Sequence, residues 1–303
     1  MSLKFYNFKK VNFIKGEKMK FYKFNSSGND FVFVAADKNA INGDFSKFAR
    51  QICDRYTGVG ADGFVAITNG DKANHIIWRF YNCDGSEAAM CGNASRAAAF
   101  FATEIGLADI SQTIFLHTLA GIIEAKVSKV CKVAPNTPNA SFGNVANVAV
   151  KLSEPQKKAE PFSEDGYLWH FYDTGVPHLV TFIDDLSAAD MKIAQKLRAK
   201  YDANVNFCEI KDGEIFIRTF ERGVEAETLA CGTGMCAAAL AYRAIEPINS
   251  GVKTKLHPKS NDEILVYIQG SGLYFEGAVN SVFSTEIGIL NCGKIVGFDI
   301  SGF

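Results

Sequence analysis

The chain has 303 residues, of which 48% are hydrophobic and 21% are charged, and its formal net charge is −1. This length and apolar content allow one large domain or two modest domains with buried cores. The near-zero net charge provides no basic face for nucleic acid, and the apolar stretches are far shorter than a membrane span. No apolar segment follows the N-terminal lysines, so we expect no signal peptide and a cytoplasmic protein that binds neither nucleic acid nor membranes.

Eight cysteines raise the question of disulfides or zinc. The chain is long for a disulfide scaffold, and a reducing compartment disfavours such bridges. A zinc site usually shows close cysteine pairs, whereas the closest pair here, Cys231 and Cys236, has no matching second pair. We therefore expect no metal site, and we expect most of the cysteines to be small buried hydrophobic residues.

The first half of the chain begins with a basic and aromatic leader over residues 1–18 that shows no clear period. Residues 20–34 predict a strand, a tight turn and a second strand, because apolar and aromatic residues flank a run of Asn, Ser, Gly and Asp. Apolar residues at helical spacing predict a helix over residues 45–55. The β-branched and aromatic residues of 64–67 and 76–81 predict two further strands.

A Cys-Gly-Asn sequence that starts at Cys91 follows these strands and opens an alanine-rich helix, which we expect to end near Ile105. A hairpin is expected over residues 113–127. Residues 129–144 have the composition of a loop-like insert, and the segment 153–155 is the best candidate for a domain boundary.

The second half repeats this order of elements. The repeated elements are a strand, turn and strand over 168–183, a helix over 188–200, strands over 205–210 and 214–220, a helix opened by Cys231 and ending near Ala244, and a hairpin over 253–275. A shared order with a Cys-Gly at the same place favours a duplicated unit. The alternative is two generic α+β halves that agree by chance.

The sequence therefore predicts an α/β (α+β) protein of two pseudo-symmetric halves. The first half would comprise residues 19–154 and the second residues 155–276, with about 277–287 as a segment that can return to the first half. Residues 1–18 and 288–303 are left as an unassigned leader and tail.

A cysteine at the start of a helix is a candidate for chemistry. A helix N-terminus presents unpaired N–H groups and positive partial charge, which bind a carboxylate and lower a thiol pKa. If a pseudo-twofold axis relates the halves, one substrate carboxylate can accept hydrogen bonds from both helix starts, while Cys91 and Cys231 stand on opposite faces of its α-carbon. The amides concerned are those of Gly92, Asn93, Gly232 and Thr233. For a single Cys-Gly, plain burial in the core is the better interpretation, but the duplicated pair favours catalysis.

At these residues the sequence resembles the diaminopimelate epimerase family, over about residues 19–287. Any one of the matching motifs alone would be weak, but six of them follow the family's order. The motifs are Ser27-Gly-Asn-Asp-Phe31, Gly58-Val-Gly-Ala-Asp-Gly63, Asn82-Cys-Asp-Gly-Ser-Glu87, Met90-Cys-Gly-Asn93, Gly175-Val-Pro-His178, and Glu221-Arg-Gly223 leading into Ala230-Cys-Gly-Thr-Gly234.

This resemblance implies a cofactor-independent epimerase that interconverts LL- and meso-diaminopimelate in lysine and peptidoglycan-precursor synthesis, with neither pyridoxal phosphate nor a metal. It implies that each half is a curved mixed sheet wrapped around a central helix, and it makes a homodimer an expectation. The catalytic thiols would be those of Cys91 and Cys231, and His178 would lie near the cysteines and tune them.

The positions that match the family's substrate-binding side chains are Asn29, Asn82, Asn204, Glu221 and Arg222. A guanidinium suits the distal carboxylate of the substrate because it binds in a bidentate fashion, and asparagines suit a zwitterion because they offer both a donor and an acceptor. Simpler interpretations stay open, namely asparagines favoured by turns, a solvated Glu221–Arg222 ion pair and a structural His178. Val176 stands where some members carry a substrate-binding asparagine, so the source of that distal contact is left open.

Three rival interpretations remain. Gly58, Gly60 and Gly63 fit a dinucleotide-binding glycine pattern, but a strand-like run follows them where that motif needs a helix. A related two-cysteine racemase, such as a proline racemase, would not need an arginine for a distal carboxylate. A non-catalytic ligand-binding module of the same fold would not need both cysteines.

Overall fold

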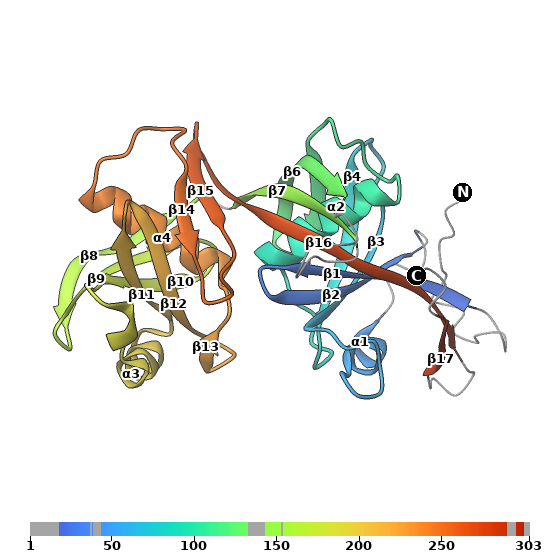
Figure 1. Cartoon of the computed structure of the whole chain (residues 1–303), viewed down its shortest axis with the longest axis horizontal. Coiled ribbons are helices and arrows are strands. Elements are labelled where there is room, and N and C mark those ends of the chain that lie inside the picture. The colour runs from blue at the N-terminus through green and yellow to red at the C-terminus, as the bar shows by residue number, and fades with distance from the viewer. Residues whose placement is uncertain are drawn as a thin grey trace. The chain divides into compact units, whose positions relative to one another are not determined.

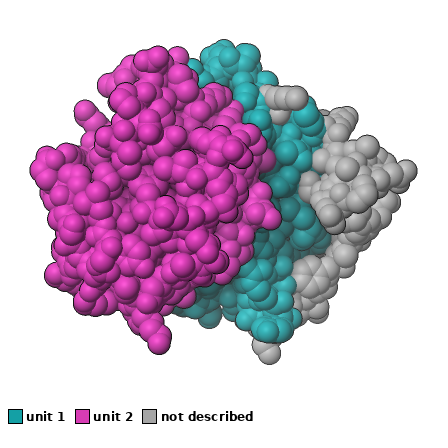
Figure 2. Space-filling view, turned by 60° about the vertical axis from the view of Figure 1, so that its left-hand side comes forward, with its two compact units in different colours: residues 1–148, 279–303 teal, residues 149–278 magenta. Residues whose placement is uncertain are grey.

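The structure is a computed structural model in which the chain divides into two compact units (Figures 1 and 2). Unit 1 comprises Met1–Val148 and Val279–Phe303, and unit 2 comprises Ala149–Ala278. The sequence had placed the boundary near 154–155 and the return of the chain at about 277–287. The residues that the structure describes are 18–36, 38, 44–132, 143–152, 154–289 and 295–299.

Unit 1 is a mixed sheet with two helices. Its sheet alternates antiparallel and parallel pairs, from β1–β2 (antiparallel) and β2–β3 (parallel) to β3–β4, β4–β5 and β5–β6. The strands are β1 (Lys18–Ser26), β2 (Asn29–Ala35), β3 (Gly63–Asn69), β4 (His75–Asn82), β5 (Ile114–Thr118), β6 (Gly121–Lys132) and β7 (Asn144–Leu152), and the helices are α1 (Ser46–Cys53) and α2 (Gly92–Glu104). On the side away from β2, strand β1 pairs with β16 (Gly272–Ile289).

Unit 2 repeats this arrangement. The pairs β10–β11 (parallel), β11–β12 (antiparallel), β12–β14 (parallel) and β14–β15 (antiparallel) have the same order and directions as β2–β3 to β5–β6. The strands are β8 (Gln156–Glu164), β9 (Tyr167–Asp173), β10 (Pro177–Phe182), β11 (Asn204–Lys211), β12 (Glu214–Glu221), β13 (Ala226–Thr228), β14 (Thr254–His257) and β15 (Ile264–Gln269), and the helices are η2 (Leu186–Ala188), α3 (Met191–Tyr201) and α4 (Gly232–Ile245).

Each unit wraps its sheet around one helix. In unit 1, α2 contacts β1, β2, β3, β5 and β6, and in unit 2, α4 contacts β9 to β12, β14 and β15. Most residues of α2 and half of those of α4 are buried, as expected of helices that are largely apolar. The run of alanines allows the surrounding strands to approach closely. The fold is therefore the predicted α/β class, with a curved mixed sheet around a central helix in each half. No helix in the described part of the chain is long and apolar enough to cross a membrane.

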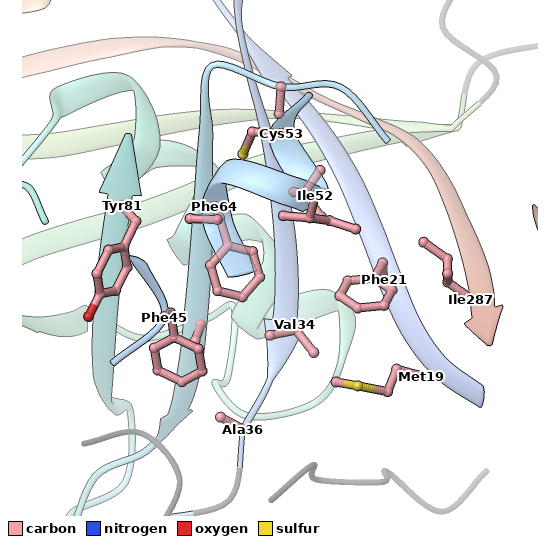
Figure 3. Packing of buried hydrophobic residues seen from close by; sticks show 14 residues of the cluster. Met19, Phe21, Val34, Ala36, Phe45, Ile52, Cys53, Phe64, Tyr81 and Ile287 are labelled. Atoms are coloured by element: carbon pink, nitrogen blue, oxygen red, sulfur yellow. The ribbon is translucent and has the colours of Figure 1, made fainter. Parts of the chain in front are cut away.

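Strands β2, β3, β10 and β11 are buried on both faces. In β2, Phe31 and Phe33 turn to the aromatic core that contains Phe24 and Phe101. The alternate residues of β2 pack under α1 in the cluster of Figure 3, which includes Met19, Phe21, Val34, Phe45, Ile52, Phe64 and Ile287. In unit 2, α3 packs on the sheet through an equivalent cluster that includes Trp169, Leu197 and Phe207.

Three expectations from the sequence need correction. The expected hairpin over 253–275 is three strands, β14, β15 and the start of β16. The expected loop over 129–144 is strand up to Lys132 and again from Asn144, while residues 133–142 lie outside the described residues. Strands β7 and β8 had not been predicted. β8 reads Gln-Lys-Lys-Ala-Glu-Pro-Phe-Ser-Glu and is mostly exposed, so it lacks the apolar alternation that marks a strand.

The leader and the tail are described only in part. Residues 1–17 lie outside the described residues, and Lys18 begins β1. In the tail, β17 (Ile295–Asp299) pairs antiparallel with β16, and residues 290–294 and 300–303 are not among those described.

The substitution Phe24→Ala tests the packing of the aromatic core of unit 1. Its fully buried ring lies 5.3 Å from the ring of Phe33, 5.7 Å from that of Phe100 and 5.6 Å from that of Phe101. We expect Phe24→Ala to lower the free energy of unfolding by about 3–5 kcal/mol, measured by urea denaturation. The control Tyr56→Ala removes a ring that is 97% exposed and should change the free energy of unfolding by less than about 0.5 kcal/mol. Equal effects of the two variants would contradict this packing.

Candidate active site

Both candidate catalytic cysteines are the N-cap residues of the central helices. Cys91 precedes α2 with φ −145° and ψ 126°, and Cys231 precedes α4 with φ −125° and ψ 108°. The Cys91 carbonyl accepts the first helical hydrogen bond from the Ser95 amide at 2.8 Å, and the Cys231 carbonyl accepts one from the Met235 amide at 3.0 Å. Cys91 is partly exposed and Cys231 is 8% exposed.

The first-turn amides follow directly from these caps. The N–H groups at the start of a helix have no acceptor within their own helix, and the positive end of the helix dipole lies beside them. Each unit therefore presents backbone donors at the positions that the sequence predicts to bind a carboxylate. These are Gly92 and Asn93 in unit 1, and Gly232 and Thr233 in unit 2.

In unit 1 the side chains at the helix start form a connected polar chain. Asn93 Nδ2 donates to Asn29 Oδ1 at 2.7 Å, and Asn29 Nδ2 donates to Asp62 Oδ2 at 3.1 Å. On the other side, Arg96 Nη2 donates to both Asn93 Oδ1 and Ser27 Oγ at 2.7 Å. Both amides are therefore held in one orientation, and the structure brings together the two predicted residues Asn29 and Asn93.

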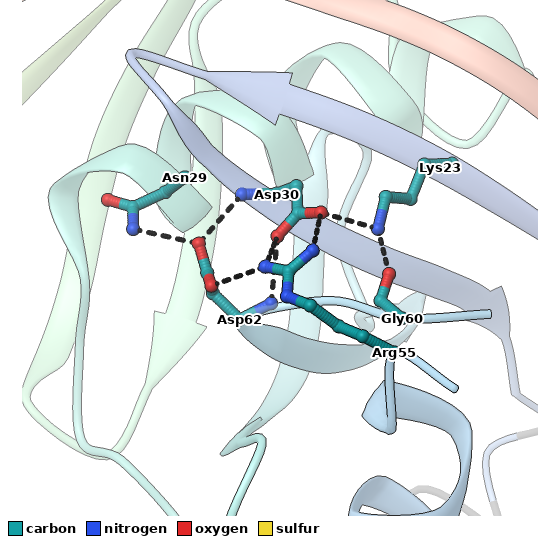
Figure 4. A network of polar contacts seen from close by, with 6 residues as sticks. All are labelled: Lys23, Asn29, Asp30, Arg55, Gly60 and Asp62. Atoms are coloured by element: carbon teal, nitrogen blue, oxygen red, sulfur yellow. Dashed lines mark hydrogen bonds and ion pairs between the residues drawn. The ribbon is translucent and has the colours of Figure 1, made fainter. Parts of the chain in front are cut away.

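Asp62 belongs to a wider ionic network, shown in Figure 4. Arg55 bridges Asp30 at 2.9 and 3.0 Å and Asp62 at 2.8 Å, while Lys23 pairs with Asp30 at 2.7 Å and also donates to the Gly60 carbonyl. Burial alone would raise the pKa of Asp30, but the hydrogen bonds from Arg55 and Lys23 hold that pKa below its usual value. The network links the turn at Asn29 to the glycine-rich segment 58–63. This segment leads directly into strand β3 and not into a helix, which agrees with the rejection of a dinucleotide-binding motif.

Asn82 lies at the end of β4, in a turn. Its amide Nδ2 donates to Ser86 Oγ at 3.0 Å, and its backbone N–H donates to the Ser86 carbonyl at 2.9 Å. Gly63 at the start of β3 is opposite Asn82 and also pairs with Phe31 near the start of β2. Asn82 therefore lies at the same end of the sheet as Asn29, and part of its side chain is used by the turn, as the simpler interpretation allowed.

In unit 2 His178 lies against the start of α4. Its Nε2 is 2.9 Å from Thr233 Oγ1, and Thr233 Oγ1 is 3.5 Å from Cys231 Sγ. His178 is fully buried on β10, and its pKa is lowered to about 3, first by burial and then by the charge of Arg222. The imidazole is therefore neutral at physiological pH, so any influence on Cys231 passes through hydrogen bonds.

Asn204, Arg222 and Glu221 occupy the same end of the unit 2 sheet. Asn204 Nδ2 donates to the Pro177 carbonyl at 3.0 Å, and Asn204 Oδ1 accepts the Arg222 amide at 2.8 Å. The Arg222 guanidinium pairs with Asp202 at 2.9 Å, so its ion-pair partner is not the neighbouring Glu221 proposed in the simpler interpretation. Burial raises the pKa of Glu221, although a hydrogen bond with Thr228 opposes this shift.

Comparison with known proteins decides the family. The family model described as diaminopimelate epimerase matches residues 21–142 and 170–280. The chain belongs to the diaminopimelate epimerase family.

Several family members are similar over nearly their whole length. A diaminopimelate epimerase from Campylobacter jejuni subsp. doylei is 45% identical over 269 residues, which cover 88% of this chain and 98% of the relative. Relatives of the same name from Nitratiruptor sp. and Helicobacter pylori are 42% identical over 268 residues and 37% identical over 281 residues. The matches cover 88% of this chain and 98% of the Nitratiruptor protein, and 89% of this chain and 97% of the Helicobacter protein.

Solved structures at low identity show how widely the epimerase fold is used. A phenazine biosynthesis protein of the PhzF family from Bacillus anthracis has a TM-score of 0.64 at 14% identity, covering 89% of this chain and 99% of that chain. A hydroxyproline epimerase from Agrobacterium vitis has a TM-score of 0.63 at 13% identity, covering 90% and 93%. At these identities the likeness shows the fold alone.

Two polar residues of this epimerase-family chain were missed by sequence reasoning. Arg96 is fully buried on α2, and Asn206 is fully buried on β11. Each carried a signal that could have been used, since Arg96 is the one charged residue in an alanine-rich helix before Glu104, and Asn206 lies between the apolar residues Val205 and Phe207 of a strand. A polar side chain within such a segment must find hydrogen-bond partners.

His178 should give unit 2 a distinctive pH dependence. In the unfolded chain a histidine binds a proton below about pH 6.5, whereas folded His178 resists protonation until about pH 3. Protons therefore favour the unfolded state, and stability should fall as pH drops from about 6.5 toward 3, by up to about 1.4 kcal/mol per pH unit. Urea unfolding at several pH values should show this slope in the wild type and a smaller one in His178→Gln.

The control for this measurement is Leu119→Ala, which removes no titratable group. The Leu119 side chain is 64% exposed, so this variant should keep the wild-type slope. Parallel profiles for the wild type and His178→Gln would show that folding does not lower the pKa of His178.

Proposed function

We propose that this protein interconverts LL- and meso-diaminopimelate by proton transfer between one α-carbon and two thiols, those of Cys91 and Cys231. One observation carries this proposal, in combination with family membership. The N-cap position of the central helix is a cysteine in each of two units that share one strand order. The activity would supply lysine and peptidoglycan-precursor synthesis, as the family resemblance implies.

The proposed reaction balances within the two thiols and the substrate. A thiolate on one face of the α-carbon takes the α-proton, so the C–H bond breaks and an S–H bond forms. A thiol on the opposite face then gives its proton to the same carbon, so its S–H bond breaks and a C–H bond forms with inverted configuration. The enzyme ends with the protonation states of the two sulfurs exchanged, ready for the reverse direction.

The intermediate carbanion needs electrostatic stabilisation, because its negative charge spreads onto the α-carboxylate. Backbone N–H groups that are already oriented toward that carboxylate stabilise the added charge without reorganisation. Gly92 and Asn93 supply such donors at one helix start, and Gly232 and Thr233 supply them at the other. The positive ends of both helix dipoles add to the effect.

Side-chain recognition of the substrate is assigned to Asn29, Asn82, Asn204, Glu221 and Arg222. In this proposal Arg222 binds the distal carboxylate, and its backbone contact with Asn204 and ion pair with Asp202 hold it in place. A homodimer in the cytoplasm remains a prediction, and light scattering of the purified protein would test its oligomeric state.

Exchange of the α-hydrogen tests the two-thiol reaction. Incubation with LL-diaminopimelate in heavy water under reductant should yield the meso isomer with deuterium at one α-carbon, followed by chromatography and mass spectrometry. Cys91→Ala and Cys231→Ala should each lower epimerisation by about 10³-fold or more, because each removes one of two proton-transfer groups.

The matched control is Cys131→Ala, which removes an exposed thiol on β6 and should leave epimerisation unchanged. If diaminopimelate is neither exchanged nor epimerised, the same assay with L-proline tests for a racemase. Failure with both substrates would leave a ligand-binding module of this fold.

Arg222→Lys tests recognition of the distal carboxylate. Loss of a bidentate, charge-assisted contact should raise KM for diaminopimelate by about tenfold or more, with kcat within about threefold. Arg218→Lys is the matched control, because Arg218 forms the same kind of paired contact with Glu227, at 2.7 and 3.1 Å. An unchanged KM in Arg222→Lys would remove Arg222 from the substrate site.

A further inference from the structure

The strands beneath the starts of α2 and α4 have the same arrangement, but their residues differ. The register Phe31↔Gly63 in unit 1 corresponds to His178↔Asn204 in unit 2. Likewise Val65↔Phe80 corresponds to Asn206↔Thr219. The positions equivalent to His178, Asn206 and Thr219 are therefore apolar in unit 1. These three residues form the polar triad of unit 2, and the shared fold does not require them to be polar.

The side-chain amide of Asn206 has only one possible orientation. Its Nδ2 donates to the Leu179 carbonyl at 2.8 Å, and this carbonyl can only accept. Its Oδ1 lies 2.9 Å from Thr219 Oγ1, which donates to it. The second N–H of Nδ2 therefore points to His178 Nδ1 at 3.2 Å.

The packing of α4 holds this amide in place. A Cβ atom at Gly234 would lie 2.5 Å from Asn206 Oδ1 and 3.3 Å from His178 Cε1. Only glycine fits there, because a Cβ at the shorter of these distances would overlap the amide oxygen. Asn206 is fully buried, so no water competes for its hydrogen bonds.

An amide N–H directed at His178 Nδ1 fixes the tautomer of the imidazole. Nδ1 must accept, so the single proton of the neutral ring lies on Nε2. Nε2–H then donates to Thr233 Oγ1 at 2.9 Å, while Asn204 Nδ2, 3.5 Å from the same nitrogen, donates instead to the Pro177 carbonyl at 3.0 Å. The Thr233 hydroxyl proton is thus left for Cys231 Sγ at 3.5 Å. Each hydrogen bond of this chain is donated toward the sulfur, from Asn206 to His178, then to Thr233 and then to Cys231.

We propose that Asn206 is a positioning residue that sets the direction of this hydrogen-bond chain, so that the chain stabilises the thiolate form of Cys231. The apolar positions of unit 1 give Cys91 no counterpart of the triad. The two thiols, which are symmetric in the fold, are therefore unequal, and Cys231 is the sulfur that this chain prepares to accept a proton. The kinetic part of this inference rests on the proposed function, whereas the tautomer and the thiol reactivity do not.

Nitrogen NMR of the unaltered protein gives the first test. The chain has only five histidines, so ring-¹⁵N labelling is tractable, and the His178 signals are those missing from His178→Gln. The expected result is a neutral ring protonated on Nε2 at pH 7. A proton on Nδ1, or a doubly protonated ring, would overturn the proposal without any variant of Asn206.

Asn206→Asp is the sharpest variant, because it keeps the shape and replaces the N–H donor by an acceptor. His178 Nδ1 must then carry the ring proton and donate to the carboxylate, Nε2 accepts a hydrogen bond from the Thr233 hydroxyl, and Cys231 loses its donor. The pH at which Cys231 reaches half of its maximal alkylation rate, read by mass spectrometry of its peptide, should rise by about one unit. The same pH for Cys91 should not move, and kcat for diaminopimelate should fall by about tenfold with KM within about twofold.

Asn74→Asp is the matched control. Asn74 is a buried asparagine of unit 1 whose Nδ2 donates to the carbonyls of Asp109 at 3.0 Å and Thr113 at 3.3 Å. It should lose stability without altering the alkylation profile of Cys231. If Asn206→Asp does not fold, Thr233→Val should raise the half-reaction pH of Cys231 while the Nε2–H tautomer persists. An unchanged Cys231 profile in a folded Asn206→Asp or Thr233→Val would overturn the proposal.

Discussion

The structure depends on wrapping a sheet around a helix whose first turn stays partly exposed. Backbone N–H groups at that position have no acceptor in their own helix, and a buried donor that stays unsatisfied costs free energy. In each unit the sheet wraps closely around an alanine-rich helix, with the cap cysteine at its first turn. A scaffold that places such donors beside a thiol is suited to a ligand that brings a carboxylate, and the arrangement occurs once in each unit.

A repeated scaffold does not imply a repeated site. In unit 1 the residue after Cys91-Gly92 is an asparagine, which is tied through Asn29 to Asp62 and through Arg96 to Ser27. In unit 2 the equivalent residue is Thr233, which contacts a neutral His178. One helix start thus contacts a hydrogen-bond network that includes Arg96 and Asp62, and the other contacts a neutral imidazole, although the strand order around them is the same. The duplicated fold supplies geometry, and the later divergence of a few buried positions supplies the electrostatic difference.

Sequence reasoning reached the helix starts because Cys-Gly followed by alanines is a local pattern with a physical meaning. It also reached most of the order of elements along the chain, the family and most of the polar residues near the two helix starts. It missed β8, whose polar exposed face has no period to detect, and it missed Arg96 and Asn206, whose partners lie far away along the chain. Nothing local shows that the Asn206 amide meets a histidine 28 residues earlier. Such long-range pairings require the register of the sheet.

The path of the chain through the two units has a consequence for its synthesis. Unit 2 is continuous from residue 149 to 278, whereas unit 1 needs residues from 279 onward. The strand β1, near the beginning, pairs with β16 on the side away from β2. As the polypeptide leaves the ribosome, β1 therefore exposes an unpaired edge until the whole of unit 2 has been translated, and such edges invite association with other chains. Unit 1, which begins first in the chain, is therefore completed last.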